Sequence, residues 1–472
     1  MLKLIAPFRV LFSLDSSLVA ANHGAFTAFL RQVEKELQDP QSGICSRISP
    51  ALDVIVNVPV EASDSEIGSR YISVNANGSL YLSPRVFTVH FKASEAEELK
   101  KIYTKSALMA DEVVGQHSNC FTPDIASLRV DLQDNTIATL SLELAVDTKQ
   151  TGAWNRLDEW TTVLVHFLLA GLYETYIFPL LEALREFSEK VESHFIQSVN
   201  DYNIFLDLVG DADEPRNDIR KRFILMWVNR TLCYYNDYPV NAWMKPLFKQ
   251  HEIQHVRGAE VHLNSGNSLV LMPAGMDTRH LGQLWDVMLT AQYYYAALDV
   301  VNLNLVKYIG TTFNRQSSRN LRRLSGEMES IINKITILQV RYNDFMMELQ
   351  GVPRKLFHVL QKEWDFAVLA GNVSKKLELC KSNIEVLNQE TNHRNQGRTE
   401  VVLTSLTGMG VLNLFVELGN YATQMPPEHM GMVGKIPGFM DLGFIMSGNA
   451  LSWIGIFIAV SVIVYTAKNR LL

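Results

Sequence analysis

The sequence predicts a mixed α+β cytosolic domain, followed by a long helical stalk and a C-terminal hairpin of two transmembrane helices. Three observations support this prediction. Short β-rich runs alternate with helical runs over residues 1–150, apolar residues recur at helical spacing over most of 276–400, and two long apolar segments lie within 401–467. Residues 151–275 are predicted to be mainly helical and to end in a β-hairpin, and 468–472 to form a basic cytoplasmic tail.

The composition is typical of a soluble body that carries a small membrane part. The chain has 472 residues, of which 47% are hydrophobic, and a formal net charge of −7. A chain lying mostly in lipid would be far more apolar. There is no long basic run, so we expect no nucleic-acid partner. The four cysteines form no CxxC pair, which favours a reducing compartment over a disulfide framework.

The first 150 residues are predicted to form an α/β domain. Short β-rich runs separated by turn residues are predicted strands, at 4–14, 52–60, 70–74, 86–91 and 137–146. Helical runs at 25–37 and 94–107 alternate with them. Charged Lys3, Arg9 and Asp15 interrupt the first apolar run, so we expect a strand there and not a signal peptide.

Residues 161–181 form an apolar stretch with two interpretations. Because it contains His166, Glu174 and Pro179, we predict a buried helix of the body, and a further membrane span is the alternative. Later in this region, 260–264 and 268–272 flank Ser265-Gly266 and are predicted to pair as a hairpin.

The stalk is predicted from helical periodicity. Helices are expected at 278–313 and 317–350, before a break at Gly351 and Pro353. In the helix that follows, residues spaced 3, 4, 3 and 4 apart give the rhythm of a coiled-coil seam: Leu377, Cys380, Ile384, Leu387 and Thr391. The alternative is an amphipathic helix packed on its own domain. No proline separates this seam from Val401, and Gly397 is the only weak point, so this helix is expected to continue into the membrane.

The two predicted spans differ in polarity. Residues 442–467 contain no charged residue, whereas 401–424 carry a polar stripe. Gly410, Asn413, Glu417 and Asn420 recur at i, i+3, i+7 and i+10, which is one face of a helix. A carboxylate at membrane depth is costly unless it faces water or a partner. The stripe therefore indicates a pore or an oligomer interface; alternatively, Glu417 marks the end of a shorter span.

Basic residues predict the orientation of the hairpin. Arg394 and Arg398 precede the first span, and Lys468 and Arg470 follow the second. In the connecting loop, Lys435 is the only lysine or arginine. By the positive-inside rule, both termini of this integral protein of the inner or plasma membrane are expected in the cytoplasm.

The residues after the first span resemble a known family. Gly419-Asn420-Tyr421 is followed by Met425-Pro426-Pro427-Glu428. With the order of body, stalk, two spans and basic tail, they resemble the CorA family of divalent-cation channels. That family has Gly-Met-Asn, then an aromatic residue and, in some members, Met-Pro-Glu. This chain lacks the methionine of Gly-Met-Asn, and the match is architectural outside the C-terminal part.

The resemblance implies a CorA-like funnel, a homo-oligomer and specifically a pentamer, which passes or senses Mg²⁺ or another divalent cation in a lipid bilayer. Mg²⁺ gives up its water reluctantly, so a ring of amide oxygens suits the hydrated ion. The implied roles are a pore mouth at Gly419 and Asn420 with Tyr421 beside it, a pore lining at Asn413 and Glu417, and an acidic outer loop at Glu428. The alternative is a membrane effector of the same architecture that a cytosolic small-molecule ligand switches, without Mg²⁺ transport.

A rival motif suggests a membrane-anchored zinc metalloprotease. In the segment His251-Glu252-Ile253-Gln254-His255, two histidines at i and i+4 match HExxH, with Glu252 as the general base. A strand pattern begins soon after the motif, and the chain has twelve histidines, so a chance match is the preferred interpretation. Without a phosphate-binding loop, dinucleotide motif or nucleophile elbow, we predict no enzyme and no catalytic residue.

Overall fold

The computed structural model describes most of the chain, which divides into two compact units. Described are residues 1–10, 12–45, 48, 52–58, 85–91, 96–115, 121–146, 156–196, 223–235, 245–249, 253–313, 318–424 and 460, with the backbone alone for 411–424. One unit comprises Met1–Phe313 with Ser330–Cys380, and the other comprises Asn314–Glu329 with Lys381–Leu472.

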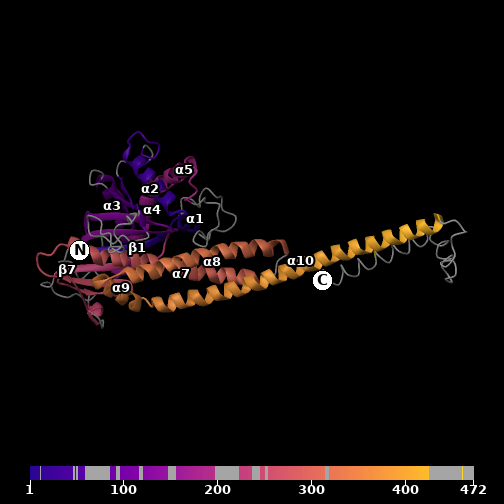
Figure 1. Ribbon diagram of the computed structural model, residues 1–472. Helices are drawn as coiled ribbons and strands as arrows, with labels where there is room; N and C mark the ends of the chain where they lie inside the picture. Colours follow the sequence, from indigo (N-terminus) through magenta and orange to yellow (C-terminus); the bar gives the residue numbers. More distant parts are fainter. Residues whose placement is uncertain are drawn as a thin grey trace, which may run out of the picture. The chain divides into compact units, whose positions relative to one another are not determined.

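A single mixed sheet forms the centre of the first unit (Figure 1). Its strand order over the described residues is β2-β3-β4-β5-β1-β7-β10-β9-β8, and β6 also pairs with β1. Neighbouring strands are antiparallel except β7 and β10, which are parallel. The strands are β1 Leu2–Arg9, β2 Leu52–Val56, β3 Arg85–Phe91, β4 Phe121–Gln133, β5 Ile137–Val146, β6 Ile224–Leu225, β7 Asn229–Tyr235, β8 Gln254–Val256, β9 Ala259–His262 and β10 Asn267–Met272.

Helices α2 to α5 cover one face of this sheet, and α7 covers the other (Figure 1). On the first face are α1 Ser16–Ala21, α2 His23–Gln38, α3 Ala96–Val114, α4 Leu157–Leu172, the π-helical turn η4 Tyr173–Ile177 and α5 Phe178–Lys190. The remaining helices are η5 Lys245–Lys249, η6 Thr278–Leu281, α7 Gly282–Phe313, α8 Ser318–Glu348, α9 Gly351–Glu363 and α10 Phe366–Gln424.

Strand β5 explains why the two faces differ. Leu140, Leu142 and Leu144 are fully buried and belong to the apolar core that α1 to α5 cover. Because successive side chains of a strand point to opposite faces, the residues between them, such as Ser141 and Glu143, lie on the α7 side. The sheet therefore presents an apolar face to one helical layer and a polar face to α7.

The sequence predicted several of these elements. Strands at 4–14, 52–60, 86–91 and 137–146 correspond to β1, β2, β3 and β5, and the two predicted helices correspond to α2 and α3. The predicted hairpin is confirmed as β9 and β10, and Gly266 in its turn has a φ of +93°, which glycine adopts without strain. The strand predicted at 70–74 lies outside the described residues.

The domain boundary predicted at residue 150 does not coincide with a boundary between the two compact units. Residues on both sides of it lie in one unit, and β7 pairs directly with β1. Within 151–275, the described residues form α4, η4 and α5 up to Lys190, and then strands β6 to β10 with the short helix η5 between β7 and β8. These strands belong to the same sheet as the first 150 residues.

The apolar stretch at 161–181 lies in α4, η4 and α5. Among the described residues, Leu157–Lys190 is long and apolar enough to cross a membrane, and half of its most apolar window is buried. Trp160, Leu164 and Leu168 of α4 are fully buried in the core with strands β1 and β5. Such burial is typical of a core helix in a soluble body, and it favours the buried-helix interpretation over a further span.

Helix α10 continues without a break into the first predicted span. The chain turns at Asp365, whose φ is +51°, and the backbone is then helical over 59 residues, from Phe366 to Gln424. Gly397, the weak point expected from the sequence, does not interrupt it. Apart from Val460, the second predicted span lies outside the described residues and stays a prediction.

The seam predicted along this helix is buried within the single chain at its first three positions. Leu377 is 7% exposed, Cys380 1% and Ile384 6%. The side chains of Leu387 and Thr391 lie outside the description. This burial favours the alternative in which the helix packs on its own chain over an intersubunit coiled coil at these three positions.

Candidate functional site

The residues predicted to line a pore lie in the last turns of α10. Asn413, Glu417, Gly419, Asn420 and Tyr421 all have helical backbone, so the spacing of the polar stripe applies to a helix. Their side chains lie outside the description, as does the whole of Glu428. The structure therefore provides the helix that the stripe requires and leaves the pore itself a prediction.

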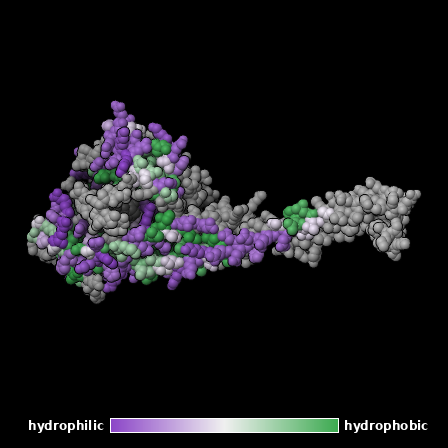
Figure 2. Space-filling view, in the orientation of Figure 1, coloured by the Kyte–Doolittle hydropathy of each residue, from purple (hydrophilic) through white to green (hydrophobic). Residues whose placement is uncertain are grey.

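The described start of this span exposes apolar side chains. Val402, Leu403 and Leu406 are 58%, 62% and 62% exposed, and Figure 2 shows a hydrophobic patch on α10 next to its hydrophilic turns. The hydroxyls of Thr404 and Thr407 donate to the backbone carbonyls four residues earlier, at 2.7 and 2.8 Å. Because these hydroxyls are hydrogen-bonded within the helix, the surface around them is mainly apolar. Such a surface is more favourable in lipid than in water.

The structure does not provide the helix that the zinc motif needs. His255 lies in strand β8, so the i, i+4 arrangement on one helix face is not formed at this position. His251 and Glu252 lie outside the described residues. In the described part of the chain, no group of three or more His, Cys, Asp or Glu residues is arranged to hold a metal ion.

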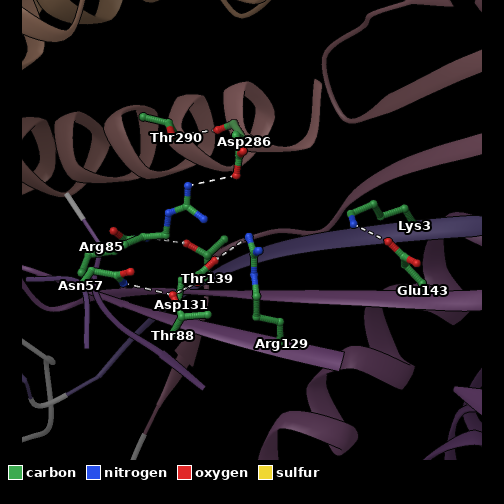
Figure 3. A network of polar contacts seen from close by, with 11 residues as sticks. Lys3, Asn57, Arg85, Thr88, Arg129, Asp131, Thr139, Glu143, Asp286 and Thr290 are labelled. Carbon is green, nitrogen blue, oxygen red and sulfur yellow. Dashed lines mark hydrogen bonds and ion pairs between the residues drawn. The ribbon is translucent and has the colours of Figure 1, made fainter. Parts of the chain in front are cut away.

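The polar face of the sheet forms a network with α7 that the sequence did not predict (Figure 3). We call it the polar layer; it comprises Lys3, Asn57, Arg85, Thr88, Arg129, Asp131, Thr139, Glu143, Asp286 and Thr290. Its residues come from β1, β3, β4, β5 and α7, and from the end of β2. Most of these side chains are buried, so their charges need partners inside the protein.

An ion pair joins the first residue of β3 to α7. Arg85 Nη2 lies 3.0 Å from Asp286 Oδ1, and the two side chains are 9% and 11% exposed. The Thr290 hydroxyl, one turn further along α7, donates to the Asp286 carbonyl at 2.8 Å. Both charges are buried, and each has its partner on a different element. The pair therefore fixes where the first turns of α7 lie on the sheet.

A second pair lies beneath an indole of α7. Lys3 Nζ is 2.5 Å from Glu143 Oε1 on the neighbouring strand, and it lies 4.7 Å from the ring centroid of Trp285. Burial lowers the pKa of Lys3, and the adjacent Glu143 carboxylate partly offsets this effect. The cation is thus held between a carboxylate of the sheet and an aromatic face of α7.

Asp131 is the most deeply buried charge of the layer, with no exposed side-chain surface. The Thr88 hydroxyl donates to Asp131 Oδ1 at 2.9 Å, and Asn57 Nδ2 donates to the Thr88 hydroxyl at 3.2 Å. Arg129 Nη2 lies 3.0 Å from Asp131 Oδ2 as an ion pair without hydrogen-bond geometry. The carboxylate is therefore neutralised by its own strand and held in place by β3.

The turn between β4 and β5 extends these ties to α8. Tyr293 of α7 donates to Asp134 Oδ1 at 2.6 Å and accepts from Asn135 Nδ2 at 2.7 Å. Arg341 of α8 pairs with the other oxygen of the same carboxylate. Burial raises the pKa of Tyr293, so its hydroxyl stays protonated and able to donate.

These contacts join α7 to the sheet at several points. The polar layer pairs its charges, and its hydroxyls act as hydrogen-bond partners within it. Directional polar contacts hold α7 at a defined place on the sheet, and breaking one partner of a buried pair leaves an uncompensated charge. The layer is thus a candidate site for passing a change in the sheet to the helices.

An open surface hollow lies at the start of α4. It encloses about 560 Å³ and is lined by Val113, Val114, Arg156, Asp158, Glu159, Thr162, Val163 and Arg230. All three guanidinium nitrogens of Arg230 donate, to the Thr161 hydroxyl, the Val228 carbonyl and the Thr162 hydroxyl. These contacts bind the Arg230 guanidinium to the first turns of α4 and to the Val228 carbonyl.

No protein-family model matches this chain, and no curated protein or solved structure matches it either. The resemblance of the C-terminal part to CorA therefore stays a prediction.

Proposed function

We propose that the chain is a CorA-like membrane protein in which α10 carries changes in the cytosolic body to a divalent-cation path lined by its own C-terminal turns. The observation that supports this most is the continuity of α10. One helix includes turns packed in the body, the polar turns at 388–400 and the apolar segment at 401–424. A continuous helix transmits a displacement along its length, because its backbone hydrogen bonds resist bending.

The apolar start of the segment supports a place in the bilayer. Val402, Leu403 and Leu406 are exposed in the single chain, and nearby threonine hydroxyls are bonded to the helix backbone. Exposure of three large apolar side chains within five residues is unfavourable in water and favourable in lipid.

The polar stripe supports a shared water path. Asn413, Glu417 and Asn420 recur on one face of a helix that is otherwise apolar. A carboxylate at bilayer depth is tolerated where it faces water or another polar group. A single helix cannot enclose such a path, so several copies, five by resemblance, would surround it and offer amide oxygens to hydrated Mg²⁺.

The polar layer supports control by the body. It ties α7 to the sheet through Asp286 and Trp285, and the ring of Tyr295, further along α7, lies 5.1 Å from that of Phe366, the first residue of α10. A cation or a small cytosolic ligand acting on the sheet would thus act on α10 through α7.

Flux through liposomes tests the proposal. The purified full-length protein is reconstituted with a Mg²⁺-sensitive dye inside, alongside Glu417→Gln, Asn420→Ala and, as an off-stripe control, Val411→Ala. We expect the wild type and Val411→Ala to pass a divalent cation, and both stripe variants to lose rate or selectivity severalfold. Absence of ion flux under every cation and ligand condition would contradict the channel, and leakage only with a cytosolic ligand would favour the effector.

A further inference from the structure

The first turns of α10 pack on α7 through aromatic rings. The ring of Tyr295 lies 5.1 Å from that of Phe366 and 5.9 Å from that of Trp364. The rings of Tyr342 in α8 and Phe366 are stacked, with centroids 6.0 Å apart and planes at 5°. All four residues belong to the first compact unit, so this ring cluster fixes the base of α10 within the body.

Further along α10 a single cation reaches across to α7. Lys376 Nζ donates to two oxygens of Asn302, to the backbone carbonyl at 3.0 Å and to the side-chain oxygen at 2.5 Å. Asp299, one turn earlier on α7, also interacts electrostatically with Lys376, and burial raises the pKa of its carboxyl. Tyr295, Asp299 and Asn302 are spaced four and three residues apart, so they share the face of α7 that α10 meets.

The two kinds of contact differ in what they resist. Stacked and edge-on rings are held by apolar contact and tolerate small rotations. A hydrogen bond from an ammonium group depends on distance and direction, and it is lost when the helices shift. Ten residues separate Phe366 from Lys376, which is about 15 Å along a helix. The rings and the buried Val373 and Leu377 thus hold α10 by apolar contact, and Lys376 adds a contact that depends on direction.

We infer that Lys376 and Asn302 form a latch that fixes the base of α10 in one position along α7, and that α10 shifts on its apolar contacts when the latch opens. This conformational device lies within one subunit and needs no partner chain. Its consequence for ion flux rests on the proposed function, but its existence does not.

Amide hydrogen exchange of the full-length protein in detergent tests the latch. Lys376→Met removes the ammonium group, and Lys375→Met removes the charge of its exposed neighbour as a matched control. We expect exchange in residues 369–380 to be at least about tenfold faster in Lys376→Met, the effect of losing a hydrogen bond from a charged donor. Asn302→Ala keeps the backbone acceptor and should give a smaller increase, while Lys375→Met should match the wild type.

Exchange in Lys376→Met at the wild-type rate, or equal acceleration in Lys375→Met, would overturn the latch. If Lys376→Met fails to fold, Asn302→Ala decides instead: unchanged exchange at 369–380 overturns the latch, and selective acceleration there supports it. The flux assay separates the two proposals. A protein that passes no ion but shows selective acceleration refutes the channel alone, whereas a conducting protein without that acceleration refutes the latch alone.

Discussion

Single buried charges determine how firmly α7 is held on the sheet. Asp286 is the clearest case, because its partner Arg85 comes from another element and both side chains are about nine-tenths buried. Taking a charge out of water costs several kcal/mol, which a well-placed partner largely offsets. The free-energy cost of removing one partner is therefore larger than the net contribution of the pair.

Asp286→Ala tests this cost directly. The substitution removes the carboxylate that accepts from the buried Arg85 guanidinium, while Asp131 stays close enough to act on the same charge, and we expect the free energy of unfolding to fall by about 1–3 kcal/mol. Chemical denaturation followed by tryptophan fluorescence measures it. Glu98→Ala is the control, since the Lys101–Glu98 pair is exposed and should contribute less than about 1 kcal/mol. A similar, small loss in both variants would show that the Arg85–Asp286 pair does not fix α7.

At the scale of elements, the sequence predicted the strands and helices that bury one apolar face, because this burial sets the spacing of their apolar residues. Strand β5 and the β9–β10 hairpin have such patterns, and both form. Strand β4 was missed although Leu128, Val130 and Leu132 alternate with Arg129 and Asp131, as expected for a strand with one apolar face. These two charges pair with each other, but the Thr88 and Asn57 side chains that hold Asp131 come from distant parts of the sequence, and periodicity contains no record of such partners.

In the candidate site, too, the local pattern was predictable from the sequence and the long-range contacts were not. The polar stripe of 401–424 is a local pattern, and the helix that it requires was predictable. The polar layer depends on pairs such as Lys3 with Glu143 and Arg85 with Asp286, which lie 140 and 201 residues apart. The alternation of Thr139, Ser141 and Glu143 with leucines was visible and the helix at 278–313 was predicted, but the packing of that helix on these polar residues was not.

Continuity of α10 is the property of an element that the proposal needs most. Gly397→Pro would remove a backbone hydrogen bond in the helix interior and bend or break it, at a cost of about 3 kcal/mol. We expect this variant to keep a folded body, seen as an unchanged tryptophan spectrum, and to lose ion flux in liposomes. Gly397→Ala favours the helix and should conduct like the wild type. Full flux in Gly397→Pro would show that the body does not act through a continuous α10.

At the scale of the whole molecule, the first unit contains two apolar cores separated by the sheet. One includes Leu142 and Leu168, between the sheet and helices α1 to α5. The other includes Phe357 and Phe366, whose rings lie 6.0 Å apart in the α7 to α10 layer. Between them the polar layer replaces apolar packing with paired charges. The sheet and the helical layer therefore meet through a few directional contacts, which the proposed control of α10 by the body requires.

Thiol accessibility in the bilayer tests the central claim, a shared water path along one face of α10. In a variant without its native cysteines, single cysteines are placed at 413, 417 and 420 on the stripe and at 411, 415 and 422 on the opposite side. The protein is reconstituted and treated with a charged thiol reagent. We expect fast labelling at the three stripe positions and little at the other three. Uniform labelling, or protection at all six positions, would contradict the account.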